Sequence, residues 1–225
     1  MRKRLFCLLL ALLLLSGCAA PQQSTESDKL QVVTTLFPYY DFVRAIGGER
    51  VEATLLLPPG MEPHSFEPTP LDVVTLSRAD VLIYNGGSGE LWVEEILGSS
   101  VSDTQHVLCA MDEVEIVEAE VVEGMEETPH AHEHDHEEEH HHEEDSDHVE
   151  YDEHIWTSPV NAMAIAKAVC ATLCAADPEG TAYYEENLSA YLEELTALHE
   201  AFLSIRETAA RDILLFGDRF PLLYF

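Results

Sequence analysis

Histidine and acidic side chains, which bind transition metals readily, are concentrated in one part of this chain. Nine of the twelve histidines lie between residues 130 and 154. Neutral imidazole is a common zinc ligand, and carboxylates can complete a coordination shell. Residues 123–150 read EGMEETPHAHEHDHEEEHHHEEDSDHVE, with almost no apolar residues and no fixed ligand spacing. We therefore predict a mobile inserted loop that binds several metal ions weakly, and a solvated acidic loop without a metal role is the alternative. The auxiliary ligands predicted in this loop are His130, His132, His134, His136, His140, His141, His142 and His148.

His64 is a candidate for a defined site. It lies in LPPGMEPHSFEP, directly after the strand expected over residues 51–57. In an open α/β sheet, ligands bind beyond the carboxyl ends of the strands. The prolines around His64 stiffen its backbone, which lowers the cost of ordering it around a ligand. A surface histidine in a loop is the alternative.

His154 is the second candidate. It lies in DEHIWTSP, where the histidine-rich segment gives way to an apolar sequence. Asp152 or Glu153 can orient its imidazole, as carboxylates orient metal-binding histidines elsewhere. The alternative is one more histidine at the end of the acidic segment. His106 and His199 are predicted to be structural or surface residues.

Signals for catalysis or for a second metal site are weak. The sequence contains no G-x-S-x-G and no H-E-x-x-H, and the glycines at 86, 87 and 89 lack the lysine of a phosphate-binding loop. Cys170 and Cys174 are four residues apart in an Ala-rich helical stretch, so they share one helix face. Packing as small apolar residues is the favoured interpretation for this pair, and a zinc site is the alternative. We predict a binding protein and not an enzyme.

Charge excludes one large class of function. The 225 residues include 43 acidic and 11 basic residues, for a formal net charge of −32. Residues 112–153 contain 20 of the acids and no Lys or Arg. Nucleic-acid binding needs a basic surface and is excluded. The hydrophobic content of 46% excludes a wholly disordered chain and is enough for one large or two small domains.

The first residues have the pattern of an export signal. Basic residues at 2–4 precede a continuous apolar run over 5–15, too short to span a bilayer comfortably. Leu15-Ser16-Gly17-Cys18 resembles a bacterial lipobox, in which the cysteine is lipidated after cleavage. We predict a signal peptide over 1–17, a lipidated tether over 18–30 that anchors the protein to the membrane through Cys18, and an extracytoplasmic location. A plain signal peptide with an incidental cysteine is the alternative.

Between these segments, strand and helix patterns alternate, which indicates an α/β fold with a parallel sheet. Proline and glycine mark most of the boundaries. The expected strands are 31–36, 51–57, 81–84, one that begins at 107 and one over 213–216, and the expected helices are 37–46, 69–78, 90–97, 159–176 and 181–211.

Together these features resemble the zinc-uptake substrate-binding lipoproteins of bacterial ABC transporters. The matching segments are VVTTLFPYYDFVRAIGG, PPGMEPHSFEPTP, VLIYNGG followed by LW, the His-rich insertion and DEHIWTSP, in the family's order. The resemblance implies a two-lobed metal-receptor fold with parallel sheets, joined by a long backbone helix, with the metal in the cleft between the lobes. Residues 31–180 would form the N-terminal lobe and 181–211 the connecting helix. Residues 212–225 would begin a second lobe that is largely missing.

The resemblance also implies a ligand set. His64 and His154 would be the ligands from the first lobe. The family usually supplies a third histidine after the first strand of the second lobe, where this chain has Asp218 as the nearest possible ligand. The fourth ligand of the family, an acid, would come from the part of the second lobe that is expected to be missing here.

We therefore expect a monomeric, lipid-anchored protein that captures Zn²⁺ and delivers it to an ABC transporter permease. Manganese or iron uptake by the same fold is one alternative, because those metals favour more oxygen ligands. A surface lipoprotein that buffers metal or adheres to a host, a metalloenzyme and a non-functional truncated product are the others.

Overall fold

The computed structural model describes residues 29–61, 63–100, 104–119, 151–211, 213 and 221–225. Within these residues four strands form one parallel sheet in the order β2-β1-β3-β4. The strands are β1 (Leu30–Thr34), β2 (Val51–Leu55), β3 (Val81–Tyr84) and β4 (His106–Cys109). The helices are α2 (Phe37–Gly47), α3 (Pro70–Arg78), α4 (Leu91–Ser100), α5 (Pro159–Ala176) and α6 (Thr181–Thr208). The α/β class with a parallel sheet is confirmed.

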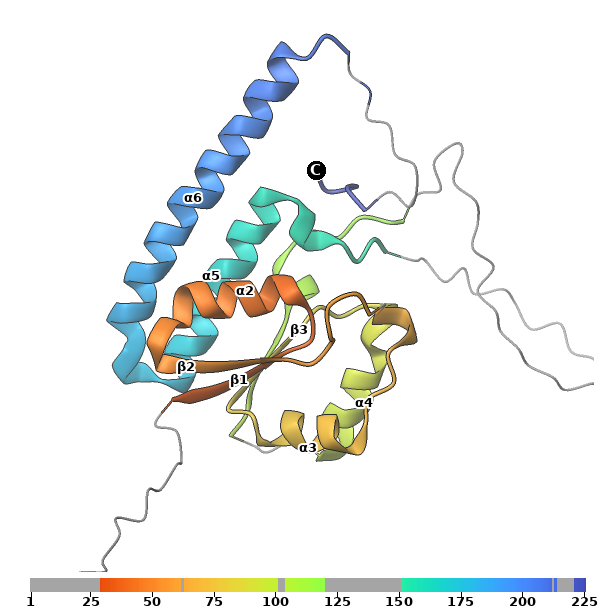
Figure 1. Cartoon of the computed structure of the whole chain (residues 1–225), viewed down its shortest axis with the longest axis vertical. Coiled ribbons are helices and arrows are strands. Elements are labelled where there is room, and N and C mark those ends of the chain that lie inside the picture. The colour runs from red at the N-terminus through yellow and green to blue at the C-terminus, as the bar shows by residue number, and fades with distance from the viewer. Residues whose placement is uncertain (1–28, 62, 101–103, 120–150, 212, 214–220) are drawn as a thin grey trace, which may run out of the picture.

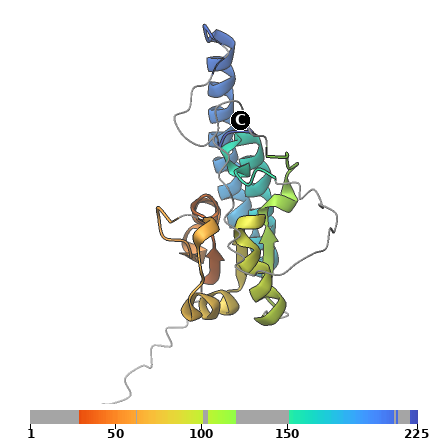
Figure 2. The ribbon, with the colours of Figure 1, turned by 90° about the vertical axis from the view of Figure 1, so that its right-hand side faces the viewer.

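The strand order determines which face each helix covers. The chain steps from β1 outward to β2, then returns across β1 to β3 and continues to β4. Because crossovers between parallel strands are right-handed, α2 packs on one face and α3 and α4 pack on the other. Helix α5 joins α2 on its face, and α6 lies outside both of them (Figures 1 and 2). The direction of winding therefore reverses between β1 and β3.

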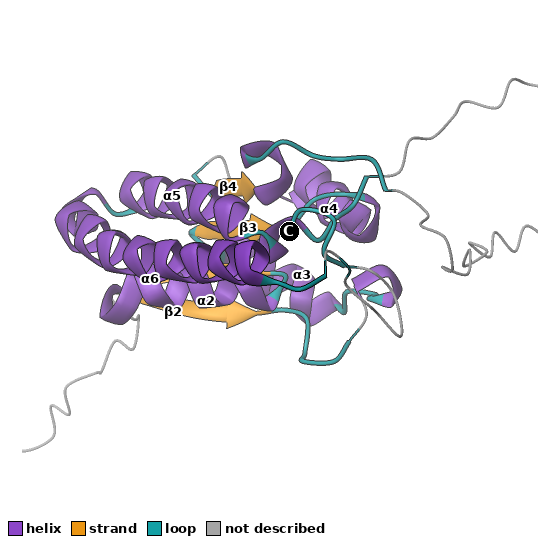
Figure 3. Ribbon diagram, turned by 90° about the horizontal axis from the view of Figure 1, so that it is seen from above, coloured by secondary structure: helices purple, strands orange, loops and turns teal. Residues whose placement is uncertain are grey.

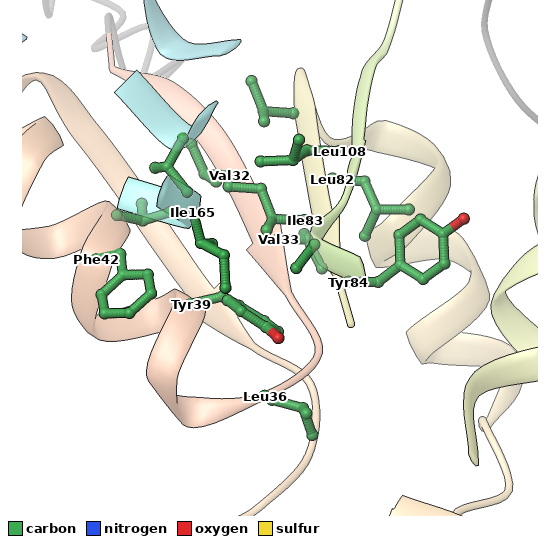
Figure 4. Packing of buried hydrophobic residues seen from close by; sticks show 14 of the residues in the cluster. Val32, Val33, Leu36, Tyr39, Phe42, Leu82, Ile83, Tyr84, Leu108 and Ile165 are labelled. Carbon is green, nitrogen blue, oxygen red and sulfur yellow. The ribbon is translucent and has the colours of Figure 1, made fainter. Parts of the chain in front are cut away.

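The hydrophobic core occupies both faces of the sheet, against α2 and α5 on one face and against α3 and α4 on the other. All four residues of β3 are buried, as expected for a central parallel strand. Figure 4 shows Val32 and Ile83 of the sheet on the side of Tyr39 of α2 and Ile165 of α5, whereas Val33 points to the opposite face. Helix α5 is apolar and long enough to cross a membrane, but Ile165, Val169 and Leu173 are fully buried. It is therefore a core helix of this lobe.

Local capping explains where two of the helices begin. The side chain of Thr69 accepts a hydrogen bond from the backbone N–H of Asp72, whose carboxylate accepts one from the Thr69 N–H in return. Ser158 accepts from the N–H of Asn161, and proline occupies the first turn of both α3 and α5. Each such cap stabilises a helix by about 1 kcal/mol.

Helix α6 is fixed to the lobe at its start. Tyr184 is fully buried, and its hydroxyl donates to Asp177 Oδ2 at 2.7 Å. Arg50 donates to the same oxygen from Nε and Nη2, and Asn187 Nδ2 donates to the Ile46 carbonyl at 2.9 Å. Seen from above, α6 lies beside α5 (Figure 3), while its later turns project past the lobe (Figure 1). The projecting half exposes Leu198, Leu203 and Ile205.

The elements expected from the sequence agree with these bounds, and the ends that differ do so by no more than three residues. Helix α4 begins at Leu91 and not at Glu90, which belongs to a 3-10 turn over Ser88–Glu90. His106 is the first residue of β4, whereas the strand was expected to begin at 107. Helix α6 ends at Thr208 and not near Arg211. Ile213 has no regular structure, and the remainder of the strand predicted there lies outside the described residues, as do the signal peptide, Cys18 and residues 123–150.

Candidate metal centre

The loops that follow the strands meet at the carboxyl edge of the sheet. A 3-10 turn over Pro63–Ser65 follows β2, and it contacts the 3-10 turn Ser88–Glu90 that follows β3. The Phe66 ring packs on Trp92 of α4, with ring centroids 5.2 Å apart. The backbone of His64 belongs to the first of these turns. The winding direction reverses at this edge, where α/β folds commonly bind ligands.

The imidazole of His154 is oriented by Asp152. Asp152 Oδ1 lies 2.8 Å from His154 Nδ1, and it also accepts a hydrogen bond from the His154 backbone N–H at 2.8 Å. The Asp152 side chain is 8% exposed and that of His154 is 43% exposed. Because a carboxylate only accepts, Nδ1 carries the proton of this hydrogen bond, and in the neutral ring Nε2 keeps its lone pair. Of the two carboxylates considered from the sequence, Asp152 is therefore the one that orients the ring.

Glu153 has a different contact. Its Oε1 accepts hydrogen bonds from Ser88 Oγ at 2.8 Å and from the Gly89 N–H at 3.1 Å. Gly87 lies beneath the carboxylate with φ +83°, where a Cβ atom would approach Glu153 Oε1 to 2.5 Å. Gly87 thus allows Glu153, the residue before His154, to dock on the loop after β3.

Two carboxyl groups near this edge have shifted pKa values. Burial raises the pKa of Glu90 to about 7, although hydrogen bonds from neighbouring groups, among them the backbone N–H groups of Gly86 and Asn85, oppose the rise. Burial also acts to raise the pKa of Asp152, but its hydrogen bonds with His154 outweigh this effect and the pKa lies below its ordinary value. Asp152 is therefore a carboxylate when it holds His154.

A short bridge closes the two ends of residues 120–150. Glu118 pairs with Tyr151 in an antiparallel bridge, and the Asp152 N–H donates to the Val117 carbonyl at 3.0 Å. Tyr224, near the end of the chain, donates from its hydroxyl to the Asp152 carbonyl at 2.6 Å and accepts from the Val117 N–H at 3.2 Å. We call this arrangement of Val117, Glu118, Tyr151, Asp152 and Tyr224 the neck. Asp152, the last residue of the neck before the helix α5 segment, is two residues before His154.

The predicted ligands fall into two groups. The turn Ser88–Glu90 contacts both the turn that carries His64 and Glu153, the residue before His154. Asp218 and the eight histidines of residues 130–148 lie outside the described residues. In the described ranges, no cluster of three or more His, Cys, Asp or Glu side chains is arranged to hold a metal ion. His106 lies at the amino end of β4, away from this edge, and His199 lies on α6.

The cysteine pair packs as small side chains. Cys170 is buried and its Sγ lies 4.0 Å from that of Cys174, so the two are not joined by a disulfide. Burial raises the pKa of the Cys170 thiol to about 12, which disfavours the thiolate that binds metals. The favoured interpretation of the pair agrees with this geometry.

Residues 32–223 match the family model described as ZnuA, zinc-uptake complex component A, periplasmic. The chain belongs to this family. It is 33% identical over 214 residues to the high-affinity zinc uptake system protein ZnuA of Bacillus subtilis, covering 92% of this chain and 62% of that protein. It is 30% identical to the manganese ABC transporter substrate-binding lipoprotein PsaA of Streptococcus pneumoniae, covering 89% of this chain and 60% of that protein.

Solved structures show the same fold. The Zn(II)-bound AdcA of Streptococcus pneumoniae aligns with a TM-score of 0.64 and 26% identity, over 81% of this chain and 34% of that one. YcdH of Bacillus subtilis, described as a metal-dependent lipoprotein, aligns with a TM-score of 0.63 and 29% identity, over 81% and 57%. The chain thus spans only 34–62% of the relatives and structures compared here.

Proposed function

We propose that this protein captures Zn²⁺ outside the cytoplasm and delivers it to an ABC transporter permease, with His64 and His154 as ligands from this lobe. The Asp152–His154 pair is the observation that carries the proposal. A buried carboxylate fixes the ring through Nδ1, and Nε2 has its lone pair available at the carboxyl edge of the sheet. Binding and release are the activity, with no chemical step.

The metal follows from the kind of ligand. Two imidazole nitrogens favour zinc over manganese, which prefers oxygen ligands. The histidines of residues 130–148 add weak nitrogen ligands that raise the local zinc concentration near the edge. Manganese uptake is the second candidate, because PsaA is named for manganese and Asp218 offers a carboxylate. Asp218 as a third ligand remains part of this proposal.

Location follows from the first residues and from the relatives. Leu15-Ser16-Gly17-Cys18 has the form of a lipobox, and PsaA is named a lipoprotein. A lipid on Cys18 would keep the protein at the outer face of the cytoplasmic membrane, where a permease can receive the metal. Membrane fractionation of wild type and Cys18→Ala tests this part: Cys18→Ala is expected to leave the membrane fraction, and its retention there would contradict the lipid anchor.

Zinc competition against a chromophoric chelator tests the ligands, because weak sites do not withstand the chelator. His64→Ala and His154→Ala are each expected to weaken the tight zinc site at least about tenfold. His106→Ala, at the amino end of β4, is the matched control and is expected to leave the affinity unchanged. Titration with Mn²⁺ in place of Zn²⁺ separates the two candidate metals. Tight binding that survives both substitutions would overturn the ligand assignment.

A further inference from the structure

Asn85 follows the last residue of β3 and lies where the winding direction of the sheet reverses. It is only 1% exposed. Its Oδ1 accepts a hydrogen bond from the Tyr39 hydroxyl of α2. Its Nδ2 donates to the Glu153 carbonyl at 3.1 Å and to the Gly86 carbonyl at 3.2 Å. Both N–H groups and the oxygen of this buried amide are therefore hydrogen-bonded.

The backbone of Asn85 is itself held by the side chain of Glu90. Glu90 is 2% exposed, and its Oε2 accepts hydrogen bonds from the Asn85 N–H at 2.6 Å and the Gly86 N–H at 3.1 Å. Two hydrogen bonds to one buried oxygen hold the backbone at Asn85 and Gly86 in place. The side chain of Asn85 thus projects from a backbone that cannot easily rotate.

The carbonyl that Asn85 holds belongs to the peptide unit that joins Glu153 to His154. The N–H of the same unit donates to Asp152 Oδ1, the oxygen that also bonds to the imidazole. Because a peptide unit is planar, fixing its C=O and its N–H fixes the orientation of the whole plane. Asn85 on one side and Asp152 on the other therefore set the direction in which the His154 side chain leaves the backbone.

We propose that Asn85 is a positioning residue for the metal site, which holds the Glu153–His154 peptide and thereby aims the His154 imidazole. The inference rests on the proposed function, in which His154 is a ligand. Asn85 itself does not touch the metal. Its removal leaves every proposed ligand in the chain.

The test compares Asn85→Ala with Asn187→Ala. Asn187 is a matched control because its Nδ2 also donates to a backbone carbonyl, that of Ile46. Ile46 lies at the end of α2 opposite to Tyr39, the partner of Asn85. Zinc affinity is measured by chelator competition, stability by urea unfolding, and site geometry by the visible absorption of bound Co²⁺. Tyr39→Phe is a milder second variant, since it removes only the hydroxyl that holds Asn85 Oδ1.

Asn85→Ala is expected to weaken zinc binding about 10- to 100-fold, the usual effect of losing a group that orients a ligand. The Co²⁺ spectrum should change as well, and Tyr39→Phe should shift both in the same direction by less. Asn187→Ala should lower stability but leave affinity and spectrum as in the wild type. If Asn85→Ala does not fold, Tyr39→Phe decides. Wild-type affinity and spectrum in a folded variant would overturn the inference.

The double variant His64→Ala plus His154→Ala separates this inference from the proposed function. If the double variant loses the tight site and Asn85→Ala keeps it, only the role of Asn85 is wrong. If the double variant keeps the tight site, the proposed ligands are wrong, and the role of Asn85 is refuted with them.

Discussion

A single oxygen of Asp152 holds both the backbone N–H and the imidazole Nδ1 of His154, each at 2.8 Å. Asp152 is also part of the neck: its N–H donates to the Val117 carbonyl, and its own carbonyl accepts from the Tyr224 hydroxyl. Asp152 therefore connects the point where residues 120–150 attach with the orientation of a proposed metal ligand.

Replacing Asp152 by alanine should weaken the tight zinc site about 10- to 100-fold, because the imidazole loses its orienting carboxylate. Chelator competition measures the change. Asp80→Ala is the control, since Asp80 accepts the Gln31 N–H at 2.8 Å at the other end of the sheet. Equal affinities in Asp152→Ala and Asp80→Ala would show that the ring needs no such partner.

The raised pKa of Glu90 gives the protein a definite pH dependence of stability. Between its ordinary pKa of 4.5 and about 7, the folded chain keeps a proton that the unfolded chain releases. The free energy of unfolding therefore falls as pH rises through this range, by an amount on the order of 3 kcal/mol.

Glu90→Gln imitates the protonated group and should remove this decline, so that the variant exceeds the wild type in stability at pH 8 but not at pH 5. Urea unfolding at the two pH values measures it. Glu95→Gln, an exposed position on α4, should follow the wild type. A wild type that loses no more stability than Glu90→Gln between the two pH values would mean that Glu90 is already ionised at pH 5.

Gly87 adopts φ +83° and ψ −175°, a conformation that is almost restricted to glycine. Gly87→Ala should destabilise the chain by about 1–3 kcal/mol and displace Glu153, whose Oε1 would lie 2.5 Å from the new Cβ. The zinc affinity of Gly87→Ala should fall as well, because Glu153 precedes His154. Gly98→Ala is the control: Gly98 lies within α4 with open space around it, so alanine there should be neutral or stabilising. Similar unfolding curves for the two variants would count against the strained turn.

Two adjacent tyrosines allow a sharp test of how α6 is fixed. Tyr184→Phe removes a buried hydroxyl from Asp177 and should lower the free energy of unfolding by about 1.5–3 kcal/mol, as for hydrogen bonds to charged groups. Tyr183→Phe removes a more exposed hydroxyl, which accepts from the Glu49 N–H at 3.3 Å, and should cost clearly less. Thermal or urea unfolding compares the pair, and a reversed order would contradict the role of Tyr184.

Local signals predicted the elements well. Strand β3 and helix α5 were predicted to the residue, because an Asn-Gly sequence ends the strand and Ser158-Pro159 begins the helix. The start of α4 was wrong by one residue. Glu90 reads as a helix former, but its side chain folds back to the N–H groups of Asn85 and Gly86, a contact that competes with helix propensity.

The site was less accessible to sequence reasoning. Asp152 and Glu153 are neighbouring acids, and only the three-dimensional contact between Asp152 Oδ1 and His154 Nδ1 decides which of them orients the ring. Asn85 gave no signal, because its partners Tyr39 and Glu153 are 46 and 68 residues away in sequence. The ligand roles of His64, His154 and Asp218 stay predictions.

Because of the neck, the geometry of the proposed metal site does not depend on the length of residues 120–150. Because Glu118 and Tyr151 are already paired, lengthening or shortening the chain between them leaves the ends where they are. A change in the length or histidine content of residues 120–150 is therefore expected to leave the orientation of the His154 imidazole as it is.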